Sequence, residues 1–279
     1  MDLSEYCAPG ATGTEETVSI SENVSLRVIH FTPPKKTEHP PVVFVPGWIS
    51  LIQGWQNVLK NMTRDFEVFY IETREKISSQ IRGKEKFGVA ELGDDIVKLI
   101  ALFGLEEKRY VLLGSSLGAT VILDCCRFLK TKPLCLVLIG PNAVFRVPKI
   151  WMAIVHGFYP PFYSIIKPVV KWYLRTFRMN LEADYAQYQK YCNALDTADP
   201  FKLKKAIIPF SKYQVWGRLS EIEIPTLIVG ASKDKLHEPA NLQKMVTMLP
   251  KVIYLDMETN QGTHSEHLVG ELRKYLLTL

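Results

Sequence analysis

Residues 111–121 read VLLGSSLGATV, and this stretch places Ser116 midway between two glycines. Gly114 and Gly118 each lie two positions from the serine, and apolar runs flank the group on both sides. Glycine tolerates the sharp, strained backbone that lifts a serine hydroxyl out of a turn, so the spacing suits a nucleophile. The same pentad also fits a helix whose glycines serve only close packing against a strand. By itself the pentad therefore favours chemistry at Ser116 without requiring it.

The surrounding sequence alternates strand-like and helix-like segments, which predicts a parallel sheet covered by helices. Unbroken apolar runs such as PPVVFV suit strands that are buried on both faces. The expected strands cover residues 17–20, 23–31, 40–45, 66–71, 110–113, 134–139, 226–230 and 251–256, and the expected helices cover 51–62, 89–103, 117–129, 239–248 and 266–277. Ser116 then lies where a buried strand leads directly into a helix. The unpaired N–H groups of that first helical turn, beginning with Leu117, are suited to hold a developing oxyanion.

The pentad GSSLG at 114–118 and the sequence VPGW at 45–48 resemble the nucleophile elbow and the oxyanion loop of the α/β-hydrolase superfamily, in its serine esterase and lipase-like members. The resemblance extends over nearly the whole chain. It implies an α/β-hydrolase fold, with a mostly parallel central sheet flanked by helices and with an inserted helical cap. It also implies that Ser116 is the nucleophile and that the backbone N–H groups of Leu117 and Trp48 form the oxyanion hole.

Two segments depart from the pattern of that superfamily. Pro46 stands where many relatives have histidine, so the oxyanion loop must be anchored differently here. After the expected strand at 66–71 the chain reads ETREKISS, where many relatives show an Asp-x-Arg-Gly-x-Gly-x-Ser-like turn. Only Arg74 and a nearby serine are similar. The resemblance therefore does not extend to a particular subfamily.

The chain order expected for the superfamily is a serine, then an acid, then a histidine. His264 lies in a glycine-containing loop after the last expected strand and resembles the catalytic histidine, whereas its rival His267 falls within the final helix. Asp234 follows the first strand after the insert and matches the usual acid loop, with Asp256 as the fallback. The alternative acid loop, before the insert, contains neither Asp nor Glu. The resemblance thus implies a triad of Ser116, Asp234 and His264.

Residues 145–215 differ in character from the rest of the chain. They are crowded with aromatic residues and carry eleven lysines and arginines against four acidic residues. In this fold such an insert resembles a helical cap, and residues 1–144 and 216–279 would form the hydrolase core. The aromatic side chains of the cap would line an apolar pocket, so we expect a small-molecule substrate with an apolar acyl part.

One face of the insert is predicted to be basic. A helix expected to start near Pro168 places Lys167, Lys171, Arg175 and Arg178 along one side. Such a face suits peripheral contact with an anionic membrane surface or with an acidic group such as a phosphate. It also suits a cap helix with an ordinary solvated face, which is the simpler interpretation.

The composition is that of an ordinary soluble protein, with 279 residues and a net charge of +5. No apolar run reaches the roughly 18 residues of a membrane span, and the N-terminal sequence lacks the apolar core of a signal peptide. The five scattered cysteines favour reduced thiols and a cytoplasmic location. Spacings typical of metal ligands and glycine-rich phosphate motifs are missing, so we expect no metal, no cofactor and no nucleic-acid partner.

These observations predict a cofactor-independent serine hydrolase that cleaves a carboxylic ester or thioester through an acyl-enzyme. Two alternatives keep the same triad, namely transfer of the acyl group to an alcohol or amine, and hydrolysis of a C–C bond. A third alternative is a non-catalytic, hydrolase-like module that binds an apolar ligand. The sequence leaves the oligomeric state open.

Overall fold

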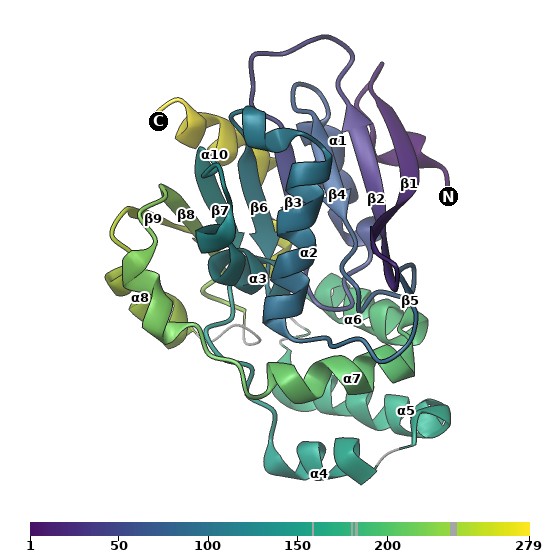
Figure 1. The fold of residues 1–279 in the computed structure, drawn as a ribbon. Helices are drawn as coiled ribbons and strands as arrows, with labels where there is room; N and C mark the ends of the chain where they lie inside the picture. Colours follow the sequence, from purple (N-terminus) through teal and green to yellow (C-terminus); the bar gives the residue numbers. More distant parts are fainter. Residues whose placement is uncertain (158, 180, 182–183, 235–238) are drawn as a thin grey trace.

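A computed structural model describes residues 1–157, 159–179, 181, 184–234 and 239–279. These residues build one nine-stranded sheet, in the strand order β1-β2-β4-β3-β6-β7-β8-β9, with β5 paired to β2 (Figure 1). The strands are β1 (Thr12–Ser21), β2 (Val24–Thr32), β3 (Val42–Val45), β4 (Val68–Ile71), β5 (Gln80–Ile81), β6 (Val111–Ser115), β7 (Cys135–Ile139), β8 (Thr226–Gly230) and β9 (Val252–Asp256). Strands β3, β4 and β6 to β9 are parallel, whereas β1, β2 and β5 pair antiparallel. The expected mostly parallel sheet is therefore present.

The middle of the sheet is formed by the most apolar strands. β3 and β6 lie side by side, with Val42 opposite Val111 and Val45 opposite Gly114. The four residues of β3 are fully buried, as an unbroken apolar run predicts for a strand covered on both faces. The nucleophile turn thus starts from one of the best-buried strands of the molecule.

Helices cover both faces of this sheet (Figure 1). One face packs against α2 (Val89–Leu102), α3 (Leu117–Cys125) and α8 (Pro239–Met248), and the other against α1 (Gln56–Met62) and α10 (Glu266–Leu276). The expected helix at 117–129 ends earlier, at Cys125, and a 3-10 turn follows. A short helix that was not expected, α9 (Asn260–Thr263), precedes α10, because the Thr259 side chain caps it by accepting from the Gly262 N–H.

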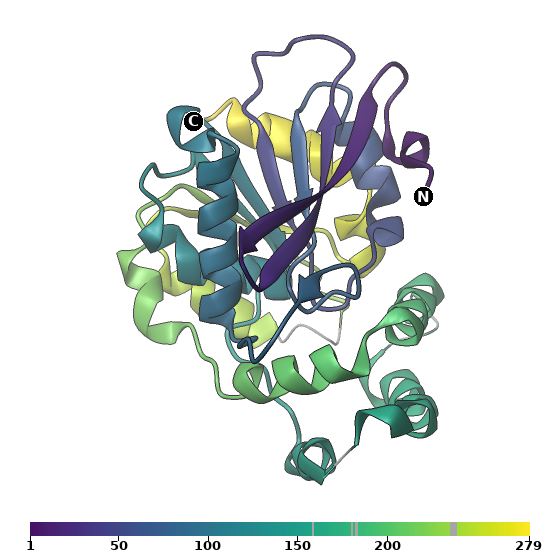
Figure 2. The same cartoon turned by 45° about the vertical axis from the view of Figure 1, so that its right-hand side comes forward.

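The chain between β7 and β8 forms a layer of helices at the carboxyl end of the parallel strands, in the lower part of Figures 1 and 2. These helices are α4 (Lys149–Gly157), α5 (Tyr163–Tyr173), α6 (Tyr185–Thr197) and α7 (Pro200–Phe210). An isolated antiparallel bridge joins Val144 to Gln214, close to both ends of the insert. The division into a core of 1–144 and 216–279 and a cap of 145–215 stays a prediction, and we use the word cap for the four helices.

The basic face of the cap differs from the expectation in two respects. Pro168 lies inside α5 and not near a helix start, because the helix already begins at Tyr163 after a 3-10 turn. Lys167 and Lys171 both form ion pairs with Asp196 of α6, at 2.8 and 2.7 Å. Since two of the four expected cations are paired within the cap, the face carries less net charge than the sequence suggests.

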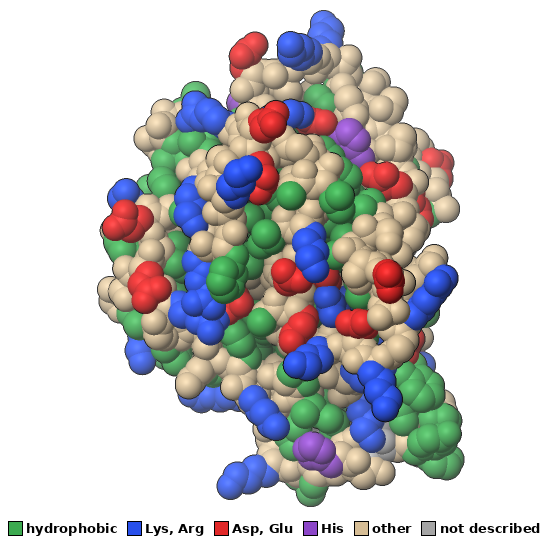
Figure 3. All heavy atoms as spheres, in the orientation of Figure 1, with side chains coloured by type: hydrophobic (Ala, Val, Ile, Leu, Met, Phe, Trp, Pro, Cys, Tyr) green, Lys and Arg blue, Asp and Glu red, His purple; other side chains and the backbone are tan. Residues whose placement is uncertain are grey.

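Large apolar side chains share the outer surface of the cap with the cations. Ile165, Val169 and Trp172 of α5 are 68%, 48% and 57% exposed. Phe162 and Phe177, which flank the helix, are equally open to solvent. Figure 3 shows a compact hydrophobic cluster at the cap end of the molecule, with Lys and Arg side chains beside it. The exposed surface of α5 is therefore apolar, and cationic side chains lie next to it.

Candidate active site

Ser116 lies in the turn between β6 and α3, and its backbone is strained. Its φ of 50° and ψ of −113° are far from the angles that a serine ordinarily adopts. Gly114 and Gly118 make this turn possible by close approach. A Cβ atom on Gly114 would lie 2.7 Å from the Ala119 nitrogen, and one on Gly118 would lie 2.0 Å from the Val45 carbonyl oxygen. The two glycines of the pentad are therefore sterically required, and the strain is consistent with a functional turn.

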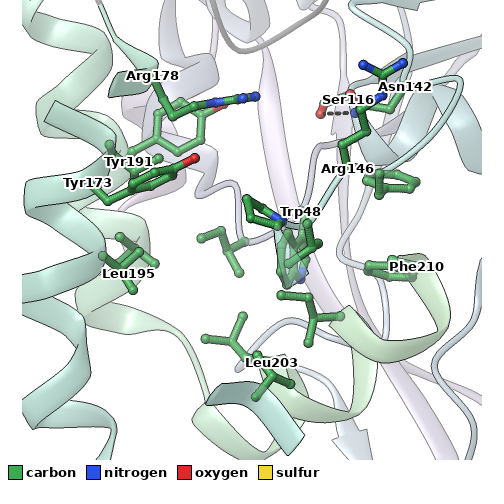
Figure 4. Close-up of a pocket in the computed structure, with 18 of the residues that line it drawn as sticks. Trp48, Ser116, Asn142, Arg146, Tyr173, Arg178, Tyr191, Leu195, Leu203 and Phe210 are labelled. Carbon is green, nitrogen blue, oxygen red and sulfur yellow. Dashed lines mark hydrogen bonds between the residues drawn. The ribbon is translucent and has the colours of Figure 1, made fainter. Parts of the chain in front are cut away.

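The hydroxyl of Ser116 contacts a residue that the sequence reasoning missed. The Asn142 side-chain amide donates a hydrogen bond to Ser116 Oγ at 2.8 Å (Figure 4). Thr120 holds the Asn142 backbone, since it accepts from the Asn142 N–H at 3.0 Å and donates to the Asn142 carbonyl at 2.9 Å. Asn142 follows β7, in the loop before the insert that contains neither Asp nor Glu. Its position directly after the strand next to β6 is the signal that could have pointed to it, because the carboxyl ends of neighbouring parallel strands lie at the same edge of the sheet.

His264 lies at the end of α9, and its ring stacks on the buried Trp55 at 3.9 Å between ring centroids. Its Nδ1 lies 2.9 Å from the Asn260 carbonyl oxygen. A carbonyl only accepts hydrogen bonds, so Nδ1 carries the hydrogen and Nε2 keeps its lone pair. This is the tautomer that a general base needs when it takes a proton at Nε2.

Ser116 and His264 line one small cavity of about 50 Å³, together with Trp48 and Lys190. The rival His267 lies elsewhere. Its side chain is 66% exposed and lies 3.4 Å from Glu271 on α10. Of the two candidate histidines, His264 shares a cavity with the serine, and its catalytic role stays a prediction.

Asp234 is buried in the loop after β8, with 6% of its surface exposed. Its Oδ1 accepts a hydrogen bond from the Gln187 side chain of α6 at 3.2 Å. Its charge also reaches the small cavity, since it helps to raise the pKa of the half-buried Tyr191, although loss of hydration is the larger cause. The fallback Asp256 has other hydrogen-bond partners. Its Oδ1 accepts from the backbone N–H groups of Ser232 and Glu258, both at 2.9 Å.

The loop carrying Trp48 packs directly against the elbow. A Cβ atom on Gly47 would lie 3.2 Å from the Ser116 Cβ. Leu117 is the first residue of α3, where backbone N–H groups have no partner within the helix. The two expected oxyanion donors, the N–H groups of Leu117 and Trp48, thus belong to segments that meet at Ser116.

A buried lysine anchors this loop from below. The Lys76 ammonium donates to the Gly47 carbonyl, and burial lowers the pKa of Lys76. The Lys76 carbonyl in turn accepts from Lys202 of α7 at 2.6 Å. Nearby, Arg74 forms a buried two-point ion pair with Asp95, at 2.6 and 2.8 Å. The segment that departs from the superfamily pattern therefore supplies the anchor that Pro46 cannot.

A second, larger cavity of about 410 Å³ opens beside Ser116, under the cap (Figure 4). Its walls are mainly aromatic and aliphatic, and they include Trp48, Phe145, Leu195, Leu203 and Phe210. Its charged lining residues are three cations, Arg146, Arg178 and Lys204, and none of the described lining residues is Asp or Glu. Uncharged polar groups come from Ser116, Asn142, Asn241 and three tyrosines. The cavity suits an extended apolar group, and Trp48, Ser116 and Tyr191 line both cavities.

Three further features bear on the expectations. Within the described ranges, no three His, Cys, Asp or Glu side chains are grouped so that they could hold a metal ion. In the same ranges, none of the helices combines the length and the apolar character needed to cross a membrane. All five cysteines are unbridged thiols, and four of them are buried.

Comparison with known proteins gives structural matches without sequence matches. No family model matches the chain, and no curated protein matches it. A hydrolase from Pseudomonas aeruginosa PA01 has a TM-score of 0.75 at 15% identity, over 95% of this chain and 97% of that one. A thermophilic esterase from Thermogutta terrifontis has a TM-score of 0.72 at 16% identity, over 95% and 99%. An α/β hydrolase from Sphaerobacter thermophilus has a TM-score of 0.72 at 17% identity, over 94% and 100%.

These matches show that the chain has the α/β-hydrolase fold along nearly its whole length. The fold class predicted from the pentad and the strand pattern is thus confirmed. The roles of individual site residues rest on the geometry above, and we argue them as proposals.

Proposed function

We propose that this protein is a serine hydrolase that cleaves a carboxylic ester or thioester with an apolar acyl group. The observation that carries the proposal is the small cavity, which is lined both by a serine in a strained elbow and by a histidine whose ring hydrogen is held on Nδ1. The likeness to an esterase and to hydrolases of the same fold supports it.

In the proposed mechanism, His264 Nε2 takes the Ser116 hydroxyl proton while Oγ attacks the acyl carbon. The N–H groups of Leu117 and Trp48 hold the resulting oxyanion. Collapse of the tetrahedral intermediate breaks the bond to the leaving oxygen or sulfur, which receives the proton from the imidazolium. Water then attacks the acyl-enzyme by the same route, and the products are a carboxylic acid and an alcohol or thiol.

Asp234 is the proposed third member of the triad. Its buried carboxylate supplies the negative charge that stabilises the imidazolium, and its pull on neighbouring groups of the cavity supports this role. The Asn260 carbonyl, at 2.9 Å from Nδ1, helps to hold the ring in its tautomer. In this arrangement the Asp234 carboxylate stabilises the positive charge of the imidazolium, and the Asn260 carbonyl holds the orientation of the ring.

The large cavity is the proposed site of the acyl group. It is mostly apolar, it adjoins Ser116, and its volume of about 410 Å³ suits a medium-length chain or a ring. The leaving group then points toward His264, in the small cavity, because that histidine must protonate it.

A fluorophosphonate probe tests the proposal. The probe should label Ser116, identified by mass spectrometry of the labelled peptide, and Ser116→Ala should lower hydrolysis of p-nitrophenyl hexanoate by about 10³-fold or more. Ser115→Ala is the matched control, since Ser115 ends β6 and lines the same small cavity, so a rate close to that of wild type would assign the chemistry to Ser116. An unlabelled wild type that hydrolyses no ester would identify a binding module instead.

We also propose peripheral contact of the cap with an anionic membrane surface, now resting mainly on the exposed side chains Ile165, Val169 and Trp172. Their apolar surface lies on α5, a helix that also lines the large cavity with Tyr163, Ile166 and Val170. A cytoplasmic location is the companion proposal, and the five unbridged cysteines support it.

A further inference from the structure

Lys190 is a cation placed inside the small cavity by a helix of the cap. It belongs to α6, and its ammonium donates to the Asn260 side-chain oxygen at 2.6 Å. The ammonium also lies 3.1 Å from His264 Nε2, the atom that must accept the serine proton. An ammonium has three N–H donors, so these two contacts leave one donor for the cavity that Lys190 lines with Ser116.

In the part of the chain that the structure describes, no carboxylate balances this charge by direct contact. Among the described residues, Lys190 forms no ion pair, and the acids whose charges act on it, Asp184 and Asp234, act from a greater distance. A partly buried cation without a paired anion is costly. A titratable group that burial perturbs inside a cavity is a candidate functional group. The loss of hydration lowers the pKa of Lys190 to about 8, so the side chain is mostly charged at neutral pH.

The position of this charge opposes the proposed catalysis of neutral esters. When His264 accepts the serine proton, an imidazolium forms beside an ammonium at about 3.1 Å. Like charges at that distance repel strongly in a site that excludes water. The ammonium also occupies the Nε2 lone pair before the reaction starts. A substrate that draws the ammonium away would remove both obstacles.

We propose that Lys190 selects substrates whose leaving group carries a carboxylate, that is, apolar acyl esters or thioesters of short hydroxy or mercapto acids. The inference rests on the proposed function, because it uses the same serine and histidine. The carboxylate binds the Lys190 ammonium, neutralises it, and leaves His264 Nε2 to the Ser116 hydroxyl. The cavity of about 50 Å³ limits the leaving group to a short chain. The proton still passes from Ser116 through His264 to the leaving oxygen or sulfur.

The test compares two substrates that differ only in charge, 2-(hexanoyloxy)acetate and 2-(hexanoyloxy)acetamide, with release of hexanoate as the readout. At pH 7 the wild type should prefer the acetate in kcat/KM by about tenfold or more, the effect of one charge-assisted hydrogen bond. Lys190→Met should bring the two values close together, and Lys190→Arg should keep part of the preference. Lys205→Met is the control, because this exposed lysine of α7 lies outside both cavities and the variant should retain the wild-type ratio.

A second measurement needs no variant. Glycolate should protect wild-type Ser116 from the fluorophosphonate at concentrations where glycolamide does not. Equal kcat/KM for the two esters, a preference that survives in folded Lys190→Met, or equal protection by the two small molecules would overturn the inference while leaving a Ser116-dependent hydrolase in place. If neither ester is cleaved and Ser116 stays unlabelled, the proposed function itself fails.

Discussion

The small cavity has two sides that are built in different ways. The elbow side consists of Ser116 and the backbone of 45–48, held by glycines that leave no room for a side chain. The histidine side consists of His264, Asn260 and Lys190, held by hydrogen bonds between side chains that are 70 to 74 positions apart. The first side depends on local steric fit, and the second depends on how the cap meets the core. Changes to the elbow should therefore act on folding and chemistry together, whereas changes to the histidine side should alter chemistry and selectivity.

The largest expected effect on the histidine side comes from His264→Ala. Because members of a triad act as a unit, kcat/KM for p-nitrophenyl hexanoate should fall by about 10³-fold or more at pH 9. His267→Ala is the control, since that ring is exposed on α10, and its rate should stay within about twofold of wild type. Thermal unfolding of both variants should resemble that of wild type. The reverse ranking of the two histidines would reassign the base.

On the elbow side, Gly118→Ala should damage stability as well as activity. The added Cβ would lie 2.0 Å from a backbone carbonyl oxygen that cannot move aside cheaply, so the free energy of unfolding should drop by about 2 kcal/mol or more. Gly217→Ala provides the comparison, because a Cβ there meets nothing within 4 Å, and it should change stability by at most about 0.5 kcal/mol. Urea unfolding measures both. A fully stable, active Gly118→Ala would show that the turn is looser than described.

A pH series isolates the charge of Lys190. For the neutral 2-(hexanoyloxy)acetamide, wild-type kcat/KM should rise by about tenfold from pH 7 to pH 9, because Lys190 loses its proton near pH 8 and with it the repulsion toward His264. Among the described residues, the charged and titratable groups facing Lys190 are His264, Asp184, Asp234 and Tyr191. All four remain in Lys190→Met, so the rise should disappear there if it belongs to Lys190. An identical rise in the variant would assign it to one of these neighbours.

The smallest effect is expected at the outer surface of the cap. Ile165→Ser/Trp172→Ser should lower the affinity for anionic phosphatidylglycerol vesicles by several-fold, roughly the effect of losing two exposed apolar side chains from the contact with the membrane. The kcat/KM for soluble esters should change little. Leu102→Ser/Phe128→Ser removes similarly exposed apolar side chains outside the cap and serves as the control. Co-sedimentation measures binding. If the cap variant and the control bind equally well, the exposed face of α5 has no membrane role.

Much of the fold could be predicted because its signals are local. Apolar runs of four to six residues marked the buried strands, and the expected strands at 226–230 and 251–256 differ from β8 and β9 by at most one residue. The helix was predicted to start near Pro168, and this was wrong. Pro160 and Pro161 begin a 3-10 turn that leads directly into α5 at Tyr163, so Pro168 lies inside the helix. The helix boundaries of the cap were harder to predict, because its helices are partly exposed and their apolar residues do not fall on a single face.

The sequence by itself determined the elbow. Gly114, Ser116 and Gly118 define a turn whose strain and close contacts follow from backbone sterics over five positions, and such constraints are visible in the order of residues. Tertiary structure alone decided which polar side chains reach that turn. Asn142 and Lys190 have no motif, and Lys190 is one of eleven cations in the insert. Its place beside His264 depends on α6 packing against the loop at 260–264, and the resulting change in hydration and charge arises only when segments distant in sequence exclude water together.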